Sequence, residues 1–124
     1  MSKAKTATPP PTESGECSQN LQPVQDALYV LSGKWKLPII IALGHGNQRF
    51  KELLRHIPGI TPRVLSKELK ELEANELVTR TVYDTMPVSI EYRLTDYADT
   101  LKPVVQALHN WGALHRKRIL KKKK

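Results

Sequence analysis

Apolar side chains recur at three- and four-residue spacing along much of the chain, which is the pattern of helices with one buried face. The first such segment covers residues 21–31, where Pro23 suits a first helical position and Gly33 can act as a left-handed stop. The second covers residues 34–43 and ends before two glycines. We expect the apolar residues of both helices to lie in the core.

Two further helices are predicted on either side of Pro58-Gly59. The helix before this turn covers residues 50–57. The helix after it starts at Thr61-Pro62, because the hydroxyl can cap the helix and the proline lacks only an N–H that the first turn does not use. This fourth helix should extend to about residue 75. Its buried stripe is predicted to consist of Val64, Leu65, Leu69 and Leu72.

The pattern then changes to strands. Residues 77–84 are rich in β-branched and aromatic side chains, and polar and apolar residues alternate from residue 89 to 94. The two segments predict a β-hairpin with one face on the core and a polar tip. Thr95 caps a last helix that should reach about residue 119, and Pro103 should kink this helix or divide it in two.

The predicted elements follow the order helix, helix, helix, tight turn, helix, hairpin, helix. This order defines a fold class that is mainly α with a small β-hairpin, an α+β arrangement. It is the order of a winged helix-turn-helix, in which the helix after the turn enters the major groove of DNA and the hairpin, or wing, contacts the flank. A fold alone does not establish a function, so charge and motifs have to support this interpretation.

The composition fits one soluble domain, with 124 residues of which 40% are hydrophobic and 26% are charged. The longest apolar run, residues 37–43, is far shorter than the about 20 residues that span a membrane. We expect a flexible arm over residues 1–18, a folded domain over residues 19–119 and a basic tail over residues 120–124. The N-terminal lysines precede no apolar stretch, which predicts no secretory signal and therefore a cytoplasmic protein.

The net charge of +8 comes mostly from residues 116–124, which hold seven basic side chains and no acid. Residues 21–115 are nearly neutral, so the total alone is weak evidence for a nucleic-acid partner. The position of the charges along the chain is more informative than their total. Between residues 49 and 70 basic residues exceed acids by four, whereas residues 71–76 hold three acids and no base. The positive charge therefore gathers at the turn and at the beginning of the fourth helix, the part that would meet DNA.

Enzyme chemistry is not expected. His45, His56, His109 and His115 have neither the HExxH spacing nor the cysteine partners of a metal site. The sequence also lacks the GxGxxG, phosphate-loop and GxSxG motifs. Cys17 is the only cysteine, which excludes an internal disulfide. We predict no catalytic residue, no cofactor and no metal.

Several stretches resemble the HxlR family of bacterial transcriptional regulators. They are LSGKWKLPIIIAL, RFKELLRHIPGIT with the following RVLSKELKELEANELVTR, VYDTMPVSIEYRLT and LKPVVQALHNWG, which lie within residues 31–112. The resemblance as a whole extends over about residues 17–112. The GKWK and RFKELLRHIPGI segments are specific to this family among winged-helix proteins. The resemblance implies a homodimer that binds a partly symmetric DNA operator and represses or activates nearby genes.

The resemblance, carried over residue by residue, places the DNA-reading positions at the turn and on the exposed face of the fourth helix: Thr61, Arg63, Val64, Ser66, Lys67 and Lys70. Arg63 and Lys67 are the strongest candidates, because Arg or Lys at guanine O6 and N7 is the commonest specific base contact. Lys70, near the middle of the helix, could contact only phosphate. The alternative is an ordinary solvated helix face.

The hairpin supplies a second set of candidates for DNA contact: Arg80, Tyr83, Thr85, Ser89 and Arg93. They could reach backbone phosphates or the minor groove, where narrow A·T tracts attract arginine. The alternative is a hairpin that only completes the small sheet. Met86-Pro87 departs from the basic tip that strong minor-groove insertion would favour.

The first and last helices carry more apolar surface than a domain of this size can easily bury by itself. A dimer seam would cover the remainder, with Leu28, Leu31, Leu101, Val105, Leu108 and Trp111 as its candidate residues. Packing within one chain is the alternative. Dimerisation would also serve recognition, because two reading helices about 34–36 Å apart can enter successive major grooves on one face of the duplex.

Cys17 lies where the expected arm meets the first helix, and a cysteine near this position resembles the switch thiol of family members that respond to oxidants or electrophiles. Lys34 and Lys36 would lower the pKa of Cys17 if they folded near it. An inert thiol, a ligand pocket under Trp35 and Trp111, and the absence of any small effector are the alternatives.

The competing function from another class is a winged-helix module that binds a protein and has lost DNA binding. Such a surface would be expected to show exposed aromatic anchors on the fourth helix, where the sequence has basic residues instead. The sequence therefore favours double-stranded DNA as the partner.

Overall fold

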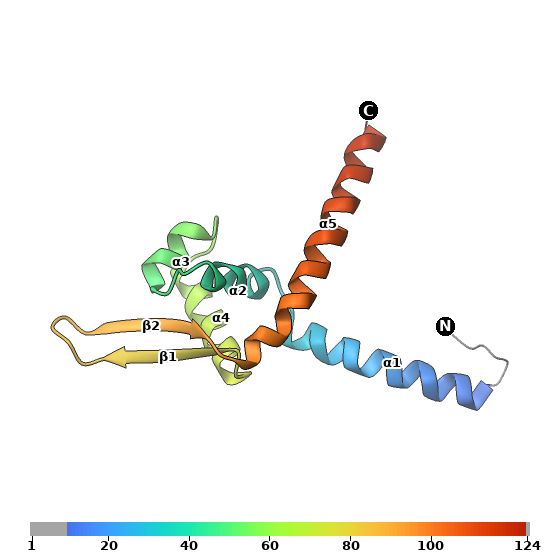
Figure 1. Ribbon diagram of the computed structural model, residues 1–124, viewed down its shortest axis with the longest axis horizontal. Coiled ribbons are helices and arrows are strands. Elements are labelled where there is room, and N and C mark those ends of the chain that lie inside the picture. The colour runs from blue at the N-terminus through green and yellow to red at the C-terminus, as the bar shows by residue number, and fades with distance from the viewer. Residues whose placement is uncertain (1–9, 124) are drawn as a thin grey trace. The chain divides into compact units, whose positions relative to one another are not determined.

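The computed structural model describes residues 10–123 and divides into two compact units, Met1–Gly33 and Lys34–Lys124. The described part of the first unit contains the helix α1 (Pro10–Leu31). The second unit contains, in order, α2 (Lys36–Gly44), α3 (Phe50–His56), α4 (Pro62–Ala74), β1 (Val78–Tyr83), β2 (Ser89–Leu94), the 3₁₀ helix η1 (Tyr97–Leu101) and α5 (Lys102–Lys123). This order, drawn in Figure 1, confirms the predicted fold class.

Helix α1 differs from the prediction in its length and in its burial. It begins at Pro10, so residues 10–18, expected in a flexible arm, are helical, and Pro23 lies inside the helix rather than in its first turn. Extending an existing helix costs less than nucleating one, so a segment with few apolar residues can still continue it. The expectation that its apolar side chains lie in the core was wrong, because Val24 and Leu28 are 55% and 64% exposed.

The core of the second unit lies between α2, α3, α4 and the base of the hairpin. Its fully buried side chains are Ile39, Leu53, Leu65, Leu69, Leu72 and Val78. The leucines of α4 are the predicted stripe, which is therefore confirmed, although Val64 beside them is only half-buried. Burying each such leucine contributes about 1.5–3 kcal/mol relative to an exposed one, so this stripe fixes which face of α4 is left for solvent.

The turn between α3 and α4 has the predicted chemistry. The Thr61 hydroxyl oxygen accepts a hydrogen bond from the Val64 backbone N–H at 3.3 Å, and Pro62 is the first helical residue. Gly59 has a φ of +85°, a backbone conformation that favours glycine. A Cβ atom at Gly59 would lie 3.7 Å from the Trp35 ring, so the start of α2 packs beside this turn.

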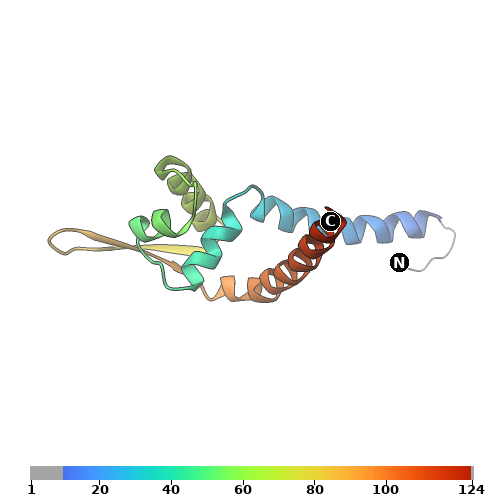
Figure 2. The same ribbon diagram turned by 90° about the horizontal axis from the view of Figure 1, so that it is seen from above.

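The hairpin is antiparallel, with a register that runs from Val78 opposite Leu94 to Tyr83 opposite Ser89. The Tyr92 backbone N–H donates to the Gln48 carbonyl at 2.8 Å, which joins the segment before α3 to the hairpin. Figures 1 and 2 show the tip of the hairpin reaching well beyond α2, α3 and α4. The wing is thus anchored at its base and free along its outer half.

Pro103 divides the last helical region, as predicted, into η1 and α5. The Thr95 hydroxyl caps this region by accepting from the Ala98 N–H at 3.2 Å. Helix α5 continues beyond residue 119 through the segment expected as a basic tail. No described helix is by itself long and apolar enough to cross a membrane, and only Leu21–Leu31 taken together with α2 passes that test of length and composition.

Candidate nucleic-acid interface

The six predicted positions on α4 lie on its cap and on its outer side. Thr61, Arg63, Lys67 and Lys70 are exposed, while Val64 and Ser66 are half-buried at the edge of the core. Residues 63, 66, 67 and 70 recur at helical spacing, so they share one face opposite the buried leucines. The structure therefore brings this part of the predicted site together.

The two strongest candidates on α4 differ in their ion pairing. Arg63 makes no hydrogen bond or ion pair with another described residue, so its guanidinium faces solvent. The Lys67 ammonium lies 2.9 Å from Glu71 Oε2 and 3.7 Å from Glu68 Oε2. The hydrogen bond to Glu71 and its negative charge raise the pKa of Lys67. Lys67 must therefore leave a carboxylate before it can contact DNA.

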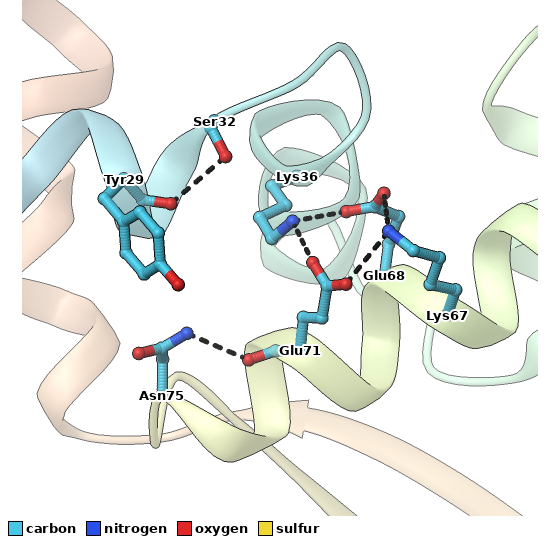
Figure 3. Close-up of polar contacts among 7 residues, drawn as sticks. All are labelled: Tyr29, Ser32, Lys36, Lys67, Glu68, Glu71 and Asn75. Atoms are coloured by element: carbon cyan, nitrogen blue, oxygen red, sulfur yellow. Dashed lines mark hydrogen bonds and ion pairs between the residues drawn. The ribbon is translucent and has the colours of Figure 1, made fainter.

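Sequence reasoning missed the residue that holds these carboxylates from the inner side. Lys36, in the first turn of α2, is only 5% exposed, and its ammonium donates to Glu68 Oε1 and to Glu71 Oε1 at 2.6 Å each (Figure 3). Burial alone would lower the pKa of Lys36, but the hydrogen bonds and charges of the two carboxylates outweigh it and raise that pKa. Lys36 and Lys67 together hold the pKa of Glu71 at about 2.

A signal for this cluster was present in the sequence. Lys36 is charged but precedes an apolar run, and Glu68 and Glu71 are three positions apart on α4, where they share one face. A lysine that enters a core is rarely left without a carboxylate partner. What the sequence could not give is the pairing across 32 and 35 positions of chain.

Lys36, which was expected to lower the pKa of Cys17 if it folded nearby, has its ammonium bound to Glu68 and Glu71. The ammonium of Lys34 lies 4.9 Å from the centre of the Trp35 ring, a cation–π contact. The backbone of Cys17 belongs to α1, and its side chain lies outside the described residues.

The five candidates in the wing are not brought together on one face. The register places Tyr83, Ser89 and Arg93 on the same face of the hairpin, whereas Arg80 lies opposite Tyr92 on the other face. Thr85 is in the tip, where its hydroxyl donates to the Pro87 carbonyl at 2.7 Å. Only part of this set could contact one stretch of backbone at the same time.

Glu91 occupies much of the polar side of the hairpin. Its Oε1 accepts from Arg93 Nη2 at 3.2 Å and from the Tyr83 hydroxyl at 3.4 Å, and the Arg49 guanidinium approaches its Oε2 at 4.0 Å. The Ser89 hydroxyl oxygen is enclosed and has no hydrogen-bond partner among the described residues. Arg80 is exposed and unpaired within the described part of the chain, which makes it the wing cation best able to meet a phosphate.

The candidate dimer residues are partly or largely uncovered. Leu28, Leu108 and Trp111 are between 49% and 64% exposed, and Leu31, Leu101 and Val105 are half-buried. Trp111 stacks on His115 one turn later with ring centres 4.9 Å apart. A groove of about 520 Å³ between α2 and α5 is lined mainly by Leu37, Ile41, His45, Val105, Leu108 and His109, and neither tryptophan lines it.

A capped basic helix that follows a tight turn, with an antiparallel hairpin behind it, defines the winged helix-turn-helix class of protein. The HxlR-like helix-turn-helix family model matches residues 30–119 of the chain. The chain therefore belongs to the HxlR family of winged helix-turn-helix transcriptional regulators.

Three relatives illustrate this membership. The HTH-type transcriptional regulator YtcD of Bacillus subtilis is 41% identical over 96 residues, which cover 77% of this chain and 76% of that protein. The HTH-type transcriptional regulator BH0655 of Halalkalibacterium halodurans is 46% identical over 97 residues, covering 76% and 86%. The solved structure of the redox regulator HypR in its reduced form is similar with a TM-score of 0.75 and 39% identity, covering 81% of this chain and 99% of that one.

Proposed function

We propose that this protein binds a partly palindromic DNA operator as a homodimer, in the cytoplasm, and that it acts by binding rather than by catalysis. Membership of the HxlR family supplies the general class, a helix-turn-helix transcriptional regulator. The observation that carries the proposal is the division of α4 into a leucine face in the core and a face with Arg63, Lys67 and Lys70 in solvent. That division gives the helix a positive surface suited to the major groove.

Each α4 residue has a distinct part in this proposal. The N-terminal end of α4 is favourable for phosphate because of its free N–H groups and its dipole, and Thr61 sits at that end. Arg63 reads a guanine edge, a contact worth about 1–3 kcal/mol against a wrong base. Ser66 and Val64 fit the groove floor beside it. Lys67 and Lys70 neutralise phosphates, and Arg80 of the wing does so on the flank.

The homodimer is supported by the uncovered apolar residues of α1 and α5. Contiguous exposed apolar surface on a small domain marks an interaction site more often than chance. In this proposal the seam consists of Leu28, Leu31, Leu101, Val105, Leu108 and Trp111, and successive major grooves require the two copies of α4 to lie about 34–36 Å apart, one helical turn of DNA. The operator is then expected to consist of two related half-sites.

A redox response through Cys17 is a second part of the proposal, favoured by the similarity to HypR, which is named a redox regulator. In this proposal the Cys17 thiols of two chains join in a disulfide while an oxidant such as diamide takes up the two electrons and two protons, and operator affinity changes as a result. Wild type and Cys17→Ser should be treated with diamide and titrated with operator DNA. A shift in affinity restricted to wild type supports the switch, whereas identical responses would remove it.

DNA binding is tested by fluorescence anisotropy with the DNA that flanks the gene, at several salt concentrations. Binding that neutralises about 6–10 phosphates should weaken about 10³- to 10⁵-fold between 50 and 200 mM salt. Random DNA of the same length is the control. Absent or salt-insensitive binding would instead favour a winged-helix module that binds another protein.

A further inference from the structure

Four charged side chains form one cluster where α2 meets α4. Glu68 and Glu71 each offer their Oε1 atom to Lys36 and their Oε2 atom to Lys67. The two carboxylates are therefore held between two ammonium groups, as Figure 3 shows. With two positive and two negative groups, the cluster is formally neutral.

The two lysines stand in very different surroundings. The side chain of Lys36 is 6% exposed, whereas that of Lys67 is 65% exposed on the face proposed to meet DNA. Lys36 comes from α2, so it cannot reach DNA from its buried position. Glu68 is itself 9% exposed, which ties it to the inner lysine. The inner lysine is fixed, and the outer one is the member free to exchange partners.

We propose that Lys36 is a positioning residue for DNA recognition, which holds Glu68 and Glu71 from the inner side and compensates half of their negative charge, so that Lys67 can be released to a DNA phosphate. This inference rests on the proposed function. When Lys67 moves to a phosphate, both carboxylates keep a cation at hydrogen-bond distance. Lys36 then compensates one of their two negative charges beside the DNA backbone.

In a protein without Lys36, moving Lys67 to a phosphate leaves a different charge on α4. Lys67 becomes the cation that both carboxylates share, so moving it to a phosphate leaves two acids uncompensated on the recognition helix. Like charges placed opposite each other are unfavourable, and the repulsion is strongest where water is excluded. Lys36→Met should therefore keep Lys67 on the protein and make α4 a poorer partner for DNA.

The test compares variants of the full chain by operator anisotropy over a salt series, with melting curves to establish folding. Lys36→Met should lose at least about twofold in affinity, the lower range for members of one ion-pair network, and its salt slope should fall by about 1. Lys36→Met/Glu68→Gln/Glu71→Gln removes the acids as well and should recover at least the wild-type affinity, with the wild-type slope. Lys102→Met, which removes an exposed lysine paired with Asp99, is the control for net charge.

Lys36→Met leaves the buried Glu68 without its inner partner, which can prevent folding. A second variant therefore tests the inference without removing Lys36. Glu71→Gln keeps the buried pair of Lys36 and Glu68 and frees Lys67 from its shorter contact. It should bind the operator more tightly than wild type, with an unchanged salt slope, because Lys67 no longer has to leave Glu71 and the number of phosphates contacted stays the same. This variant reports on the exchange of Lys67 without disturbing the core.

The inference is overturned if folded Glu71→Gln binds with unchanged affinity, or if the triple variant, once folded, binds as weakly as Lys36→Met. It is also overturned if Lys36→Met behaves like Lys102→Met. A wild-type protein that binds no DNA at all is a different failure, that of the proposed function itself.

Discussion

Helix α4 buries its apolar side chains, whereas helix α5 leaves its apolar side chains largely exposed. Leu65, Leu69 and Leu72 of α4 are at most 1% exposed, whereas Leu108 and Trp111 of α5 are 49% and 63% exposed. Both helices have apolar side chains at helical spacing, so the difference lies in what surrounds them. Helix α4 has α2, α3 and the hairpin against it, while Figures 1 and 2 show most of α5 running away from those elements.

The comparison separates two tasks within one chain. The reading helix is completed by its own chain, so its orientation does not depend on a partner. The apolar face of α5 is left largely exposed, and in the proposed function a second copy of the chain covers it. In that proposal, recognition and assembly rest on different residues, so substitutions in α4 should leave assembly unchanged.

The largest effect on folding is expected in α4. Leu69→Ala should lower the free energy of unfolding by about 2–5 kcal/mol, because it removes buried methyl groups and leaves a cavity. Urea denaturation followed by circular dichroism measures this change. Leu114→Ala on the exposed side of α5, where the leucine is 65% exposed, is the matched control and should cost far less at a concentration where the protein is monomeric. Equal losses of unfolding free energy at the two positions would contradict the difference in burial between the two helices.

A charge in the apolar face of α5 should act on assembly instead. Trp111→Glu is expected to shift the protein to a monomer in sedimentation experiments, because a carboxylate would be desolvated in the seam. Operator affinity should then fall by about 10²- to 10⁴-fold through the loss of bivalent binding, with the fold retained. Thr100→Glu, in η1, adds the same charge outside the candidate seam. A Trp111→Glu protein that remains dimeric would contradict the seam.

Removing the proposed base contact of α4 should have a smaller effect on DNA affinity, and a more sequence-selective one. Arg63→Ala is expected to cost about 1–3 kcal/mol on the operator and clearly less on random DNA, because only the operator offers the matching base edge. Parallel anisotropy titrations on the two DNAs measure the difference. Arg55→Ala removes an exposed arginine of α3 that lies outside the proposed contacts. Equal losses on both DNAs would make Arg63 a phosphate contact.

Lowering the pH should have the smallest effect, a loss of folding stability through Glu71. The pKa of Glu71 is lowered from 4.5 to about 2, chiefly by hydrogen bonds from Lys36 and Lys67. A carboxylate with a depressed pKa contributes stability above its unfolded pKa, and this contribution is lost as the pH falls toward the folded value. Urea unfolding of wild type should therefore weaken between about pH 5 and pH 2 more than that of Glu71→Gln. Parallel pH profiles for the two proteins would show that Glu71 is not held in this way.

Much of the fold could be predicted because its signals are local. Thr61-Pro62 specifies the start of α4 through one hydroxyl and one missing N–H, and the leucine spacing specifies its buried face. The extent of α1 could not be predicted in the same way. Residues 10–18 lack apolar periodicity, so nothing in their pattern distinguishes the continuation of a helix from a flexible arm.

The candidate site was predictable only in part for a related reason. Helical spacing places Arg63 and Lys67 on the same face, but it does not show that Lys67 is paired while Arg63 is not. That pairing depends on Lys36, which comes from another helix far away in the chain. Strand alternation likewise gives the two faces of the wing, whereas the capture of Arg93 by Glu91 depends on side-chain geometry.

Hydroxyl-radical footprinting of the purified protein on the DNA flanking its gene tests the central claim most directly. Two protected half-sites about 10 base pairs apart on one face of the duplex are expected, since each copy of α4 would enter one major groove. Arg63→Ala should abolish this pattern at protein concentrations where wild type still gives it. A single protected site, or protection that moves randomly along the DNA, would contradict paired recognition by α4.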